Sequence, residues 1–69
     1  MNKLEQLEAA TRALPDEYNV IRNTLLSLLE GGYLTQMRAY SLGLSDMAAH
    51  LTSDEKLLTP LRTVRELLK

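Results

Sequence analysis

The chain contains no cysteine, and this absence removes several ways of holding a small protein together. Without thiols there is no disulfide and no thiolate metal site. The single histidine, His50, does not make a metal site by itself. We therefore expect no metal and no cofactor. A chain without cysteine also fits a reducing compartment, and we expect the protein in the cytoplasm.

A strong excess of charge of one sign is missing as well. Eight Lys and Arg side chains stand against nine Asp and Glu, which gives a formal net charge of −1. Nucleic acid is therefore not an expected partner, because domains that bind it usually carry a strongly basic patch. No apolar run approaches the roughly 20 residues of a membrane span, and residues 1–5 lack the apolar core of a signal peptide. These absences predict a soluble protein that does not enter the membrane.

The length of the chain limits how it is stabilised. Sixty-nine residues form one domain at most, residues 1–69. A chain this short buries only about 60% of the surface that its unfolded form exposes, so its stability is marginal. Small scaffolds usually add disulfides, a metal or association with another chain. Because the composition excludes the first two, we expect association with a second copy (a homodimer), with another protein, or with both.

The spacing of apolar residues predicts four helices, at about 2–13, 16–30, 34–51 and 53–68. Pro15 stops the first helix and starts the second, since proline suits the first helical position. Gly31 and Gly32 end the second helix, because glycine enters the left-handed region at little cost. The short break makes the two middle helices antiparallel neighbours. The predicted fold is all-α, a small bundle of three to four helices around an antiparallel helical hairpin.

The last predicted helix leaves one question open. Thr52 and Glu55 have the spacing of a capping box, which predicts that Thr52 caps this helix. Pro60 lies within the apolar stripe of the same helix. It either kinks the helix or starts it afresh with Thr59 as the cap.

The hairpin has two apolar faces and few charges. Residues 16–30 carry a broad leucine arc, and residues 34–51 carry a seam with heptad spacing. Between residues 18 and 53 the only charged side chains are Arg22, Glu30, Arg38 and Asp46. A hairpin with so little charge is expected to be covered by the end helices, a second copy or a partner. The candidate partner-binding residues are the seam and the adjoining leucine edge: Met37, Tyr40, Leu44, Met47, Leu51, Leu26 and Leu29.

Residues 39–45 give an alternative, because their Ala-x-x-x-Gly-x-Ser spacing resembles the turn of phage-type helix-turn-helix repressors. This resemblance implies a DNA-binding regulator that uses residues 35–52. The sequence departs from that motif at Arg38 and Thr52, where apolar or core residues are usual. Residues 46–51 also offer no Arg, Lys, Asn or Gln to read a base edge. The uninterrupted seam through Gly43 favours one helix instead.

The hairpin is also similar to the small helical-hairpin chaperones of type III secretion systems. The features that carry this resemblance are a Met-x-x-Leu-Glu start, the Gly31-Gly32 junction, Gln36 and the seam on the returning helix. The sequence departs from those chaperones at Pro15 and in its further helix at residues 52–69. The pattern of residue types in residues 21–30 is similar to that of plasmid-copy-control hairpin dimers. Both resemblances imply shared architecture, and fold does not fix function.

Asp46 and His50 are spaced as a general base and its orienting group would be on one helix face. The same spacing also gives an ordinary surface pair on a helix, and no nucleophile is placed beside it. We therefore expect no catalysis. The predicted function is a non-catalytic protein–protein interaction module, a small bacterial or phage adaptor, chaperone or regulator that acts through apolar helix faces.

Overall fold

The computed structural model describes residues 2–69, and within that range the regular structure is entirely helical. The elements are α1 (Lys3–Arg12), the short 3-10 helix η1 (Asp16–Tyr18), α2 (Asn19–Glu30), α3 (Leu34–Leu51) and α4 (Glu55–Leu67). The predicted all-α bundle and its central hairpin are confirmed. Each boundary lies within a few residues of the one expected from apolar spacing.

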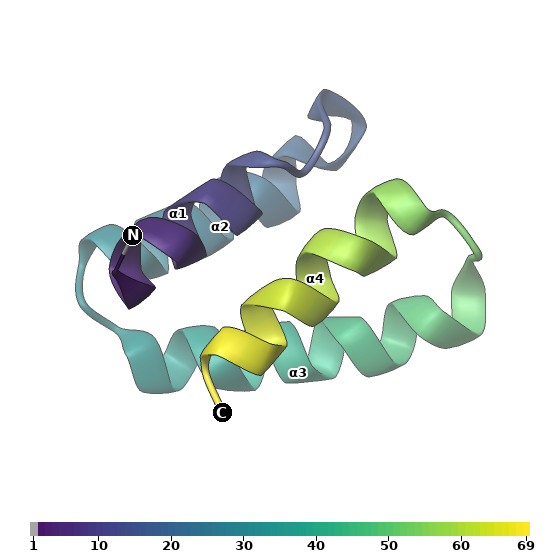
Figure 1. Ribbon diagram of the computed structural model, residues 1–69. Helices are drawn as coiled ribbons and strands as arrows, with labels where there is room; N and C mark the ends of the chain where they lie inside the picture. Colours follow the sequence, from purple (N-terminus) through teal and green to yellow (C-terminus); the bar gives the residue numbers. More distant parts are fainter. Residues whose placement is uncertain (1) are drawn as a thin grey trace.

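The four α-helices contact one another in a closed ring, α1 with α2, α2 with α3, α3 with α4, and α4 with α1. After α3 the chain turns and α4 runs back along it, while α1 and α2 lie side by side (Figure 1). Leucines dominate the core enclosed by this ring, and every helix contributes to it. The buried core residues are Leu7, Leu14, Leu25, Met37, Leu57, Leu61, Val64 and Leu68.

Local signals in the sequence fix the start of α1 and the end of α2. The Asn2 side chain accepts a hydrogen bond from the Glu5 backbone N–H at 2.9 Å, so it caps α1. At the hairpin turn Gly32 has a φ of +76°, which lies in the left-handed region. Its N–H and that of Tyr33 donate to the last carbonyls of α2. The glycine pair thus ends α2 as predicted.

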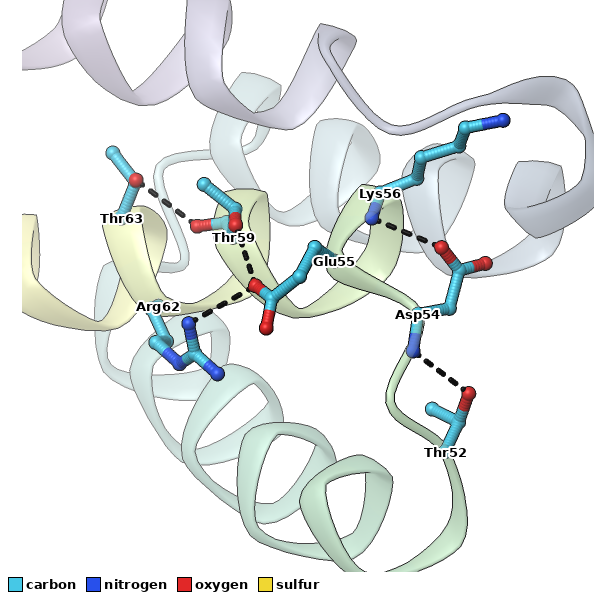
Figure 2. A network of polar contacts seen from close by, with 7 residues as sticks. All are labelled: Thr52, Asp54, Glu55, Lys56, Thr59, Arg62 and Thr63. Atoms are coloured by element: carbon cyan, nitrogen blue, oxygen red, sulfur yellow. Dashed lines mark hydrogen bonds and ion pairs between the residues drawn. The ribbon is translucent and has the colours of Figure 1, made fainter.

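The predicted Thr52 capping box is wrong. The Thr52 N–H still donates to the Ala48 carbonyl at 2.9 Å, so this residue closes α3 and is not free to open α4. Asp54 caps α4 instead, because its Oδ1 accepts from the Lys56 N–H at 3.0 Å (Figure 2). The Thr52 hydroxyl oxygen accepts from the Asp54 N–H at 3.1 Å and so orders the three-residue link between α3 and α4.

Pro60 lies inside α4, which continues from Glu55 to Leu67, so a fresh start at Pro60 with Thr59 as its cap is wrong. The Thr59 hydroxyl donates instead to the Glu55 carboxylate at 2.9 Å, and Arg62 donates to the same carboxylate at 3.2 Å (Figure 2). The proline ring is buried in the core. That burial offsets the single helical N–H that proline lacks.

Candidate partner-binding surface

Some residues of the predicted α3 seam lie in the core, and others lie on the surface. Met37 is fully buried, and Tyr40 and Leu44 pack against the core. By contrast, Met47 is 58% exposed and Leu51 is 77% exposed. The placement of Met37 on a partner-binding surface is therefore wrong, because this chain's own helices enclose it.

Two serines of α3 that are not part of the seam are buried. Ser41 and Ser45 are the other buried residues of this helix. Ser45 precedes Asp46, which pairs with Arg65 of α4 at 3.3 Å. The Ser41 hydroxyl is satisfied by donating to the Arg38 carbonyl at 3.0 Å. Sequence reasoning gave the core side of α3 to the larger residues. The size of Ser41 and Ser45 was the available signal for close helix packing.

The Leu26 and Leu29 edge is not continuous with the exposed end of the seam. These half-buried leucines line a groove of about 260 Å³ between α1 and α2. The other residues of that groove are Asn2, Leu4, Glu5, Glu8 and Glu30. The two candidate surfaces are therefore separate, because residues of α1 line the groove along this edge of α2.

Met47 and Leu51 border a shallow apolar hollow, here called the α3 hollow, with a volume of about 190 Å³. An apolar cavity of about 150 Å³ is large enough to hold benzene, so this hollow has room for one large apolar side chain. Val20, the neighbour of the lining residue Ile21, is itself 74% exposed. The lining residues are Ile21, Leu44, Met47, Ala48, Leu51, Thr52 and Leu57.

Charged side chains of the hairpin lie away from the α3 hollow. Arg22 donates to the Asp16 carboxylate at 2.8 Å and to the carbonyl of Leu14 at 3.1 Å, toward the link between α1 and η1. Asp46 accepts from Arg65 of α4 at 3.3 Å. Arg22 and Asp46 are thus each paired with a group that lies outside α2 and α3.

Glu30 and Arg38, the other two charges of the hairpin, also lie beside the end segments. Glu30 lines the groove between α1 and α2. Arg38 lines a shallow cavity together with Arg65 and Lys69 near the C-terminus. The structure therefore leaves the surface around the α3 hollow without any of the four charges that the hairpin carries.

A hydrogen bond between η1 and the start of α4 holds together the elements that border the α3 hollow. The Tyr18 hydroxyl donates to Asp54 Oδ2 at 2.6 Å. This bond to a carboxylate is the main reason that the pKa of Tyr18 is raised to about 12. The same bond, followed by the Lys56 N–H, lowers the pKa of Asp54. Asp54 therefore stays ionised while it caps α4.

The structure describes both alternatives that the sequence raised, the Asp46 and His50 pair and the helix-turn-helix of residues 35–52. Asp46 is paired with Arg65, while His50 is exposed on α3. Helix α3 runs without interruption through residues 39–45, where a helix-turn-helix needs its turn. Within residues 2–69 no three His, Asp or Glu side chains are grouped so as to hold a metal ion.

None of the helices in the described part of the chain is both long enough and apolar enough to cross a membrane. No protein-family model matches the chain. Comparison with curated proteins and with solved structures gives no significant match either. Functional inference therefore depends on the surface of the molecule itself.

Proposed function

We propose that this protein is a non-catalytic binding module that docks an apolar face of another protein chain on the α3 hollow and its rim. In this proposal Met47 and Leu51 are the principal contacts, with Leu44 at the floor of the site. The module is a small adaptor, chaperone or regulator of bacterial or phage origin that works in the cytoplasm. The contact surface is built by α2, α3 and the start of α4.

One observation carries the proposal: the large apolar side chains of Met47 and Leu51 are exposed beside an apolar hollow, and the four charges of the hairpin do not line it. Full burial of an aliphatic side chain contributes about 1.5–3 kcal/mol. For the exposed fractions of Met47 and Leu51 this amounts to roughly 2–4 kcal/mol in total, before the costs of association. That free energy is available only if another chain covers the surface.

A photo-crosslinking residue at position 47, introduced in cells of the source organism, tests the proposal directly. The matched control carries the same residue at position 49, since Ala49 is also exposed on α3 but does not line the hollow. We expect protein adducts, identified by mass spectrometry, from position 47 and few or none from position 49. No adduct from position 47, or equal yields from both positions, would contradict the proposal.

A further inference from the structure

We infer a second binding surface, which takes an acidic peptide segment that carries an apolar side chain. We call it the basic end. It is formed by four cations from α1, α3 and the C-terminal segment: Lys3, Arg38, Arg65 and Lys69. The inference does not depend on the α3 hollow, because Arg38 lies in the first half of α3 and Leu51 ends this helix, about 20 Å away along its axis.

The fold brings these cations together around two neighbouring cavities. Helices α1 and α3 begin where α4 ends (Figure 1), so segments far apart in the sequence meet at this end of the bundle. The first cavity, the Leu34 cavity, has a volume of about 300 Å³ and is lined by two cations, Lys3 and Arg38, and by four leucines: Leu4, Leu7, Leu34 and Leu68. The second, the Leu42 cavity, has a volume of about 230 Å³ and is lined by Arg38, Leu42, Arg65 and Lys69. Arg38 therefore borders both cavities.

The charges on the basic end are all of one sign. It holds four of the eight Lys and Arg side chains of a chain whose net charge is −1. Within residues 2–69 no Asp or Glu lines either cavity, whereas three carboxylates line the groove between α1 and α2. Cations grouped in this way repel one another, and an anionic ligand relieves that repulsion.

Local helix chemistry explains only part of this grouping. Arg65 lies in the last turn of α4, where the helix dipole favours a cation. Lys3, by contrast, is the first residue of α1, where the dipole disfavours one. The salt bridges among the described residues also leave Lys3 and Arg38 without a carboxylate. A carboxylate from another chain would supply the missing partner.

The ion pairs already present on the basic end leave room for such a partner. Arg65 donates to Asp46 at 3.3 Å, and the Lys69 ammonium lies 3.2 Å from the Glu66 carboxylate. All four side chains are at least 40% exposed, so water screens both pairs and each contributes little to stability. A carboxylate that enters the Leu42 cavity can take the two-point geometry that a guanidinium group favours on Arg38, with Arg65 and Lys69 beside it.

The leucines of the Leu34 cavity select among anions. Inorganic phosphate has no apolar group to bury there, and a flat membrane surface fits two concave cavities poorly. An apolar cavity of about 150 Å³ is large enough to hold benzene, so this larger cavity has room for a leucine or phenylalanine side chain. A peptide that places such a side chain beside Asp or Glu meets both requirements, and clusters of arginine are a known means of recognising acidic motifs.

Nuclear magnetic resonance titration with synthetic peptides tests this chemistry. The probe is the acetylated and amidated peptide Asp-Glu-Phe-Glu-Asp. One matched peptide has Asn and Gln in place of the acids, and the other has Ser in place of Phe. We expect the probe to shift the methyl signals of Leu34 and Leu68, with a dissociation constant of about 0.1–1 mM. Each matched peptide should bind at least about fivefold more weakly, because it lacks one of the two recognised groups.

Two variants of the protein test the residues. Arg38→Gln and the control Arg12→Gln each remove one positive charge from an exposed arginine of a helix, but Arg12 lines neither cavity. Arg38→Gln should weaken binding of the probe at least about fivefold, while Arg12→Gln leaves it unchanged. Circular dichroism checks that both variants stay folded. Raising the salt concentration from about 50 to about 500 mM should weaken binding to the wild type, because exposed charges are then screened.

Four results would overturn the inference. They are no shift at about 5 mM probe, equal binding of the uncharged peptide, undiminished binding to Arg38→Gln, and shifts confined to Met47 and Leu51. Binding to vesicles of anionic phospholipid without binding of the probe would also overturn it, since the basic end would then be a membrane contact. Crosslinking from position 47 reports on the α3 hollow alone, so the proposed function and this inference fail separately.

Discussion

The assignment of the inward face of α3 leads to a test that uses two single substitutions. A heptad pattern by itself also allows the seam that includes Met47 to face the core, whereas in the structure Ser45 is buried and Met47 is exposed. The substitution Ser45→Leu adds bulk under α4, and Met47→Ala removes bulk from the surface. The two interpretations of α3 predict opposite rankings of the stability losses.

The structure gives the size of each effect. Ser45 is 6% exposed where α3 packs against α4, so a leucine there has to push the helices apart. Overpacking of this kind costs about 1–3 kcal/mol. Because 58% of Met47 is already exposed, its truncation removes less than half of the free energy of a fully buried side chain, at most about 1 kcal/mol. Were Met47 in the core, the same truncation would cost about 2–5 kcal/mol.

Urea unfolding, followed by far-ultraviolet circular dichroism at low micromolar concentration, measures both losses in the monomer. A domain of 69 residues has a total stability of roughly 3–10 kcal/mol, so a loss near 2 kcal/mol shifts the midpoint clearly. Ala49→Leu is the control for a leucine on the outer side of α3 and should change little. A larger loss for Met47→Ala than for Ser45→Leu would refute the assignment of the inward face.

Three further outcomes follow from the packing and the hydrogen bonds. Gly43→Ala should raise the free energy of unfolding of the monomer by about 0.5–1 kcal/mol in urea, since alanine favours the helix and meets no neighbour. Leu61→Ala should lower it by about 2–5 kcal/mol, a large part of the total, because this side chain is fully buried; thermal melting measures the loss. The lowered pKa of Asp54 means that its contribution is present above the unfolded value near 3.8 and is lost as pH falls through the lower folded value. Tyr18→Phe removes the main cause of that lowering, so melting temperatures between neutral pH and pH 3 should fall less steeply than those of the wild type; an unchanged slope would contradict the role of this bond.

The local features of the fold could be predicted because each depends on neighbouring residues. The Pro15 boundary and the Gly32 turn are properties of a few adjacent residues. The continuity of α3 through Gly43 followed from its unbroken apolar pattern. The prediction that Thr52 caps the last helix was wrong because the same residue can also end the preceding helix. In the structure its N–H donates to the Ala48 carbonyl, so it ends α3.

The surface available to a partner depended on tertiary contacts that no local pattern encodes. The sequence by itself determined that two helices with few charges form a hairpin across a short glycine turn. It also predicted that other segments or another chain cover the apolar faces of this hairpin. Only the folded chain decided where the cover falls: Met37, Ser41 and Ser45 are buried, while Met47 and Leu51 stay outside. A helix turns by about 100° per residue, so several stripes of α3 are apolar enough to face a core. The helices that pack against α3 decide which stripe is buried, and here the buried stripe contains Met37, Ser41 and Ser45.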